Sequence, residues 1–238
     1  MSAPAKVYPI NPVLLAGRER YEKRWYSLLQ DFKVTDATNA TKWWNHIVAT
    51  YAGQKNRAFH NEDWLWSALN VYEDLTWTNN TWDDECAQIA IWFVRANINP
   101  NLDRFHQRME CTQMLTQCMV DLGIGTEDIK SAVRYIANYE AACDEQSYWA
   151  YHDSLRWWWG RTPITYNHSI TDLQDENSHL DDLEFIEWRV PMLEKALKET
   201  YLFRTERYRM SYEVQAQLNL SSELMDYKRV LSGLSTTS

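Results

Sequence analysis

DDECAQIAIWFVRAN, residues 83–97, is the stretch of this sequence that decides the fold. Three acidic residues open it, where the positive end of a helix dipole favours negative charge. Ile89, Trp92 and Phe93 follow at the i, i+3, i+4 spacing that marks the buried side of a helix. The same period predicts further helices over residues 15–32, 40–52, 61–75, 104–121, 126–142, 145–159, 182–200 and 211–232.

Turn-forming residues are scarce, with six glycines and six prolines among 238 residues, about half the average density. A sandwich or barrel needs a turn roughly every ten residues, so we expect a single all-α domain over residues 15–238. Residues 1–14 form an N-terminal extension in this interpretation, and residues 183–232 form a C-terminal helical extension. Residues 161–182, which are polar, acidic and without a sustained period, are predicted to be one long loop.

Charge and cysteine content exclude several classes of protein. The net charge of −9 repels phosphate backbones, which argues against binding to DNA or RNA polymers. No apolar run approaches the roughly 18 residues that a membrane span needs, and the N-terminal stretch does not resemble a secretory signal. Four cysteines without a CxxC pair indicate free thiols in a reducing compartment. We therefore expect a cytoplasmic protein.

Thirteen tryptophans stand out. Bulky rings between helices bury large areas, and aromatic residues at helical spacing are usually core. The alternative is a stacking wall for a base or nucleoside.

Familiar catalytic motifs are missing: the sequence has no GxxxxGK[ST] loop, no GxSxG, no HExxH and no pair of histidines at i, i+4. Two short stretches carry polar side chains at helical spacing. RAFHNEDW, residues 57–64, puts Arg57, His60 and Trp64 on one helix face, and HDSLRWWWG, residues 152–160, does the same for Asp153, Arg156 and Trp157. Either group could equally be a surface ion pair or a core cluster.

Together with three further stretches, these motifs resemble the HD superfamily of metal-dependent phosphohydrolases, in its small predicted branch. RAFHNEDW resembles R-x-[YF]-H-N-x-x-H up to its last histidine, and AIWFVR, residues 90–95, resembles A-x-W-F-H-D. HDSLRWWWG is similar to the last core motif. The best matches are RVPMLEKALKETYLFRT, residues 189–205, and EVQAQLNLSSEL, residues 213–224. The order and spacing hold over about residues 20–227.

The resemblance implies an HD-like helical bundle in which histidines and aspartates hold divalent metals that activate water. His60 corresponds to the first metal ligand, whereas the second histidine is replaced by Trp64 and the HD pair by Val94 and Arg95. Asp153 falls on the first aspartate of a late D-x-D pair, and the acidic segment keeps Glu110. A catalytic metal needs at least three protein ligands, so we expect no metal or other cofactor, with His60 and Asp153 as remnants of the site.

The departures predict a pseudoenzyme whose former metal pocket binds a nucleotide or another phosphorylated small molecule. In that hypothesis Arg95 brings a cation to the metal position; alternatively, it only faces solvent at a helix end. The candidate ligand-binding residues are Arg57, His60, Asn61, Trp64, Arg95 and Arg156. One alternative function is an active phosphohydrolase that uses His60, Glu110 and Asp153. Another is a protein-interaction module, binding a partner protein or a second copy through the acidic stretch 172–184 or through exposed tryptophans.

Overall fold

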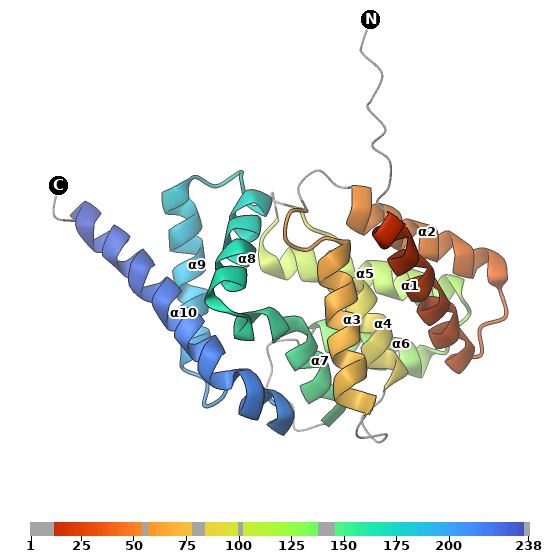
Figure 1. Cartoon of the computed structure of the whole chain (residues 1–238). Coiled ribbons are helices and arrows are strands. Elements are labelled where there is room, and N and C mark those ends of the chain that lie inside the picture. The colour runs from red at the N-terminus through yellow and green to blue at the C-terminus, as the bar shows by residue number, and fades with distance from the viewer. Residues whose placement is uncertain (1–11, 54–56, 78–83, 100–101, 138–145, 236–238) are drawn as a thin grey trace, which may run out of the picture.

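The computed structural model describes residues 12–53, 57–77, 84–99, 102–137 and 146–235, and these residues form helices and short connections with no β-strand among them (Figure 1). The α-helices are α1 (Pro12–Asp31), α2 (Ala37–Gly53), α3 (Glu62–Trp77), α4 (Glu85–Phe93), α5 (Arg104–Asp121), α6 (Thr126–Ala137), α7 (Gln146–Arg156), α8 (Pro163–Glu176), α9 (Asp182–Leu197) and α10 (Glu206–Ser235). A short 3-10 helix, η1 (Trp157–Gly160), follows α7. The all-α prediction is confirmed.

Helix α4 lies at the centre of the packing and contacts α1, α3, α5, α6 and α7. Its start is fixed by Asp84, whose side chain accepts hydrogen bonds from the main-chain nitrogens of Cys86 and Ala87. Ile89 and its four following residues are fully buried, as expected for a helix surrounded by others. The helix ends at Phe93, four residues earlier than predicted. The chain turns at Val94, and the carbonyls of Arg95 and Ala96 accept hydrogen bonds from the Arg57 guanidinium.

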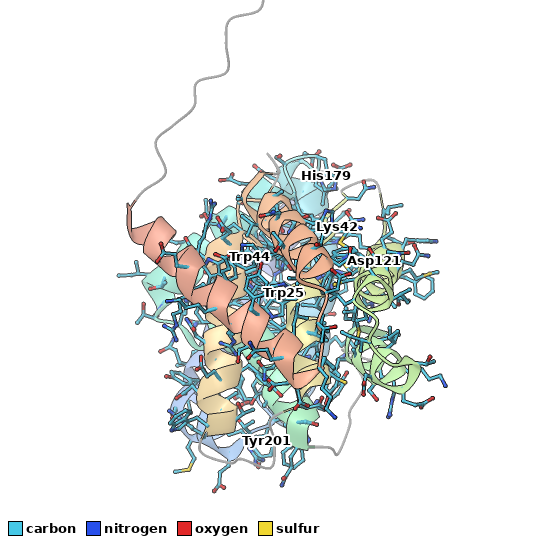
Figure 2. All side chains as sticks on the ribbon, turned by 90° about the vertical axis from the view of Figure 1, so that its right-hand side faces the viewer. Trp25, Lys42, Trp44, Asp121, His179 and Tyr201 are labelled. Carbon is cyan, nitrogen blue, oxygen red and sulfur yellow. The ribbon has the colours of Figure 1, made fainter. Side chains whose placement is uncertain are left out.

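Most tryptophans fill the core, which supports their structural interpretation. Of the twelve that the structure describes, seven are buried and only Trp77 is strongly exposed. Trp25 of α1 and Trp44 of α2 both point inward in Figure 2, and each packs edge-on against Trp92 of α4. The Trp25 indole nitrogen also donates to the carbonyl of Ala40, which fixes α1 against α2.

The prediction of a loop over residues 161–182 is wrong, because α8 occupies most of it. Thr162 caps the helix, and Pro163 stands at its first position, where a missing N–H costs nothing. The buried side carries Tyr166, Ser169, Leu173 and Glu176. These positions keep a helical spacing, but two of the four are polar, so the helix shows no continuous apolar stripe in the sequence.

Other boundaries differ by a few residues. Helix α1 begins at Pro12, inside the expected N-terminal extension, and α10 begins at Glu206, five residues before the predicted start. Helix α6 ends at Ala137, and residues 138–145 lie outside the described part. Among the helices that the structure describes, none combines the length and apolarity needed to cross a membrane.

Buried polar pairs hold the C-terminal helices α8, α9 and α10 together on one side of the molecule (Figure 1). Arg189 of α9 forms a two-pronged ion pair with Glu223 of α10, at 2.8 and 3.1 Å, and the hydroxyl of Tyr166 of α8 donates to the same carboxylate. Asn219 donates to two carbonyls at the end of η1, and the Glu213 carboxylate accepts from two main-chain nitrogens before α10. The C-terminal motif residues therefore have structural roles.

Candidate functional site

His60 lies in the short segment that leads into α3, and the carboxylate of Glu176, the last residue of α8, holds it in place. The Nδ1 atom of His60 is 2.5 Å from Oε1 of Glu176. The other carboxylate oxygen accepts hydrogen bonds from the main-chain nitrogens of His60, at 2.7 Å, and Phe59, at 3.2 Å. One carboxylate thus satisfies three donors of this segment.

The protonation states of the pair follow from its surroundings. Burial lowers the pKa of His60, and the charges of Arg95 and Arg57 lower it further, which outweighs the opposing effect of Glu176. Burial alone would raise the pKa of Glu176, but the charge that His60 carries when it is protonated, the hydrogen bonds from His60 and the charge of Arg57 bring it below its usual value. At neutral pH the carboxylate is therefore ionised, and a neutral His60 donates its Nδ1 proton to it.

Arg57 is buried, and its guanidinium group bonds to the main chain. It donates to the carbonyls of His60, Arg95 and Ala96 at 3.0, 2.7 and 2.6 Å. It also stacks over the ring of Tyr51 at 4.7 Å. These bonds join the chain after α4 to the segment before α3, so Arg57 holds these two segments against each other.

Arg95 is half-buried just beyond the end of α4. Burial lowers the pKa of His60 and raises the pKa values of Tyr51 and Cys111. The positive charge of Arg95 acts to lower all three pKa values. The main chains of Arg95 and His60 lie close together, because the Arg57 guanidinium donates to the carbonyls of both residues.

Asn61 and Trp64 are beside His60 but have local roles. The Asn61 side chain accepts from the main-chain nitrogen of Trp64 and donates to the carbonyl of Ala58, which caps α3. Trp64 is buried, with its ring centre 5.0 Å from that of His60. Its indole nitrogen has no hydrogen-bond partner among the described residues, and it cannot coordinate a cation.

Asp153 and Arg156 belong to a second cluster, built around residues 199–205. The buried Asp153 carboxylate accepts from the main-chain nitrogens of Arg204 and Thr205 and from the Thr205 hydroxyl, all at 2.7–2.8 Å. Burial raises its pKa to about 6 despite these bonds. Arg156 pairs with Glu199 at 3.0 Å. Both residues therefore fix the chain that enters α10.

Glu110 of α5 bonds to a residue that follows α4. Its carboxylate accepts a hydrogen bond from the side chain of Asn97, two residues beyond Arg95. The neighbouring thiol of Cys111 also bonds to the main chain of Asn97. Glu110 thus ties α5 to the chain that follows α4.

The side chains present do not fit the metal centre of the family that the chain resembles. His60 and Asp153 bond to different parts of the chain, and the described residues contain no group of three or more histidine, cysteine, aspartate or glutamate side chains placed to hold a metal ion. Glu176 was missed by sequence reasoning, because it lies in the predicted loop and 116 residues from its partner. No family model, curated protein or solved structure matches this chain.

Proposed function

We propose that this chain is a catalytically degenerate protein of the HD type that binds a phosphorylated small molecule, such as a nucleotide, beside His60 without hydrolysing it. The observation that supports this most is the charge balance of the cluster. The charges of Arg57 and Arg95 both lower the pKa of His60, and the carboxylate of Glu176 opposes them. Cationic side chains beside a neutral imidazole favour a bound anion.

Arg95 is the residue that would contact the ligand. Arg57 already donates to three carbonyls, so its role is to supply charge and to hold the site. Arg95 is half-buried just beyond the end of α4, and the planar fork of a guanidinium suits bidentate bonding to phosphate oxygens.

The remaining candidates contribute less to this proposal. Trp64 is buried and Asn61 caps α3, so neither is proposed to stack on or bond to a base. Arg156 pairs with Glu199 in the second cluster. The proposed binding site therefore contains fewer residues than the six that the sequence suggested.

Hydrolysis is not part of the proposal, because its required groups have other partners. The alternative active enzyme needs His60, Glu110 and Asp153 to act on one water or metal. In the structure these bond to Glu176, Asn97 and the Arg204–Thr205 main chain respectively.

Calorimetric titration with pyrophosphate and ATP tests the proposal. The wild-type protein should bind at least one of them, and Arg95→Gln should weaken binding about 10- to 100-fold, because a hydrogen bond to a charged group contributes about 1.5–3 kcal/mol. Arg20→Gln is the matched control, since the Arg20 side chain is 65% exposed on α1 and makes two long contacts, 3.6 Å to Glu73 and 5.8 Å to the ring centre of Tyr21. Equal binding by Arg95→Gln, or no binding by the wild type, would contradict the proposal. Phosphate release that His60→Ala abolishes would favour the active enzyme instead.

A further inference from the structure

Helix α10 presents a row of exposed apolar side chains to solvent. Met210, Val214, Leu218 and Met225 are 82, 73, 61 and 49% exposed. Their spacing of four, four and seven residues places them on one face of the helix. Single exposed apolar residues are ordinary, but several on one face of a helix form an apolar patch, which marks an interaction surface.

The row runs into a groove between the end of α9 and the second half of α10. The groove has a volume of about 520 Å³ and is lined by Leu197, Ser221, Leu224, Met225, Lys228, Arg229 and Ser232. We call the row and the groove together the α10 face. From Met210 to Ser232 it is about 33 Å long, at about 1.5 Å per residue. This length suits a partner helix of about six turns better than a small molecule.

Charge indicates which helix would fit. The two charged residues that line the groove, Lys228 and Arg229, are both cationic, although the chain as a whole carries −9. They pair with Glu194 and Asp226, at 2.6 and 3.3 Å, but all four side chains are more than a third exposed. Exposed pairs of this kind are weak, so acidic groups of a partner can compete for both cations.

A second copy of this chain fits the α10 face less well. Antiparallel pairing of two α10 helices would bring Lys228 and Arg229 towards Arg207 and Arg209 of the other copy. Parallel pairing would set Lys228 against its own equivalent. Both arrangements create like-charge contacts, and each copy also carries the net charge of −9.

We infer that the α10 face is a docking site for an amphipathic helix of a partner protein, with apolar residues against the Met210–Met225 row and Asp or Glu residues against Lys228 and Arg229. This is the helix-in-groove mode of recognition. The α10 face shares no residue with the proposed anion site around His60, Arg57, Arg95 and Glu176, so the inference does not depend on that site.

Fluorescence anisotropy with two designed helical peptides tests the inference. Both carry leucines at i, i+3, i+4 and i+7 over six turns, and they differ only in a terminal cluster of glutamates or of lysines. The glutamate peptide should bind saturably and at least tenfold more tightly than the lysine peptide. Leu218→Glu should weaken binding at least tenfold, and the double change Lys228→Glu, Arg229→Glu should reverse the preference. Val120→Glu, at an apolar residue of α5 that is 56% exposed, is the control and should bind as the wild type does.

Several outcomes would overturn the inference. They are no saturable binding, equal binding of the two peptides, and unchanged binding by Leu218→Glu with an unchanged circular dichroism spectrum. Sedimentation of the wild type as a dimer that Leu218→Glu dissociates would show that a second copy covers the α10 face. Pyrophosphate titration of the same samples separates this test from the proposed function, because the α10 variants should retain whatever affinity the wild type shows.

Discussion

Replacing Glu176 by alanine should destabilise the protein far more than an exposed acidic residue of α8 would. The Glu176 carboxylate is buried and accepts from the His60 ring and from the main-chain nitrogens of Phe59 and His60. Glu176→Ala removes all three acceptor contacts at once. The segment before α3 then has no other described acceptor for these donors.

The size of the effect follows from the donors left behind. Each buried donor without a partner costs about 1–3 kcal/mol, and water can reach part of the His60 ring, whose side chain is 12% exposed. We therefore expect a loss of about 3–5 kcal/mol. For a chain of this length that lowers the melting temperature by roughly 6–20 °C, at about 2–4 °C per kcal/mol.

Urea denaturation followed by tryptophan fluorescence and circular dichroism measures this loss. Asp175→Ala is the matched control, because Asp175 is exposed on the same turn of α8 and should change stability by less than about 0.5 kcal/mol. A double-mutant cycle with His60→Ala should give a coupling of about 1.5–3 kcal/mol. If Glu176→Ala is no less stable than Asp175→Ala, the His60–Glu176 bond does not hold the site, and the argument fails.

Three other changes test separate parts of the structure. Asp153 has a folded pKa of about 6 against about 3.9 unfolded, so the unfolded state releases its proton first as pH rises. The wild type should therefore lose about 2 kcal/mol relative to Asp153→Asn between pH 4 and pH 6; a difference that does not vary with pH would contradict this. Gly160→Ala should lower stability by about 1–3 kcal/mol in urea denaturation, because a Cβ there would lie 2.6 Å from Cβ of Tyr212. Gly17→Ala, inside α1 with nothing within 4 Å, should instead raise stability by about 0.5–1 kcal/mol; a Gly160→Ala variant as stable as the wild type, or a Gly17→Ala variant less stable than it, would refute the packing described.

Periodicity was sufficient to predict most of the helices, and it failed where a buried face is polar. Helix α4 has an uninterrupted apolar face, and the sequence shows it directly. Helix α8 buries Ser169 and Glu176 beside Tyr166 and Leu173, and Glu176 is stable there because its partners, Phe59 and His60, lie on a distant segment. A pattern within one helix cannot reveal such partners.

The candidate site was predictable in its members but not in their roles. The sequence suggested that Arg57, His60 and Arg95 would meet, and the Arg57 guanidinium bonds to the main-chain carbonyls of the other two residues. It could not show that Arg57 bonds to carbonyls, because the main chain that it contacts is 38 residues away. Asp153 was similarly grouped with His60, whereas its hydrogen bonds hold the chain that enters α10.

The central claim is that Glu176, rather than a metal ion, holds His60, and nuclear magnetic resonance of the histidine ring nitrogens tests it most directly. Long-range ¹H–¹⁵N spectra of the wild type should show a neutral His60 protonated at Nδ1, and its signals should remain unchanged on addition of Mn²⁺ or Zn²⁺. The Glu176→Gln variant should lose the downfield Nδ1 proton, which assigns the bond to this carboxylate. Selective broadening of the His60 signals by equimolar Mn²⁺, or a shift of them on Zn²⁺ binding, would show that the metal centre survives and would contradict the account.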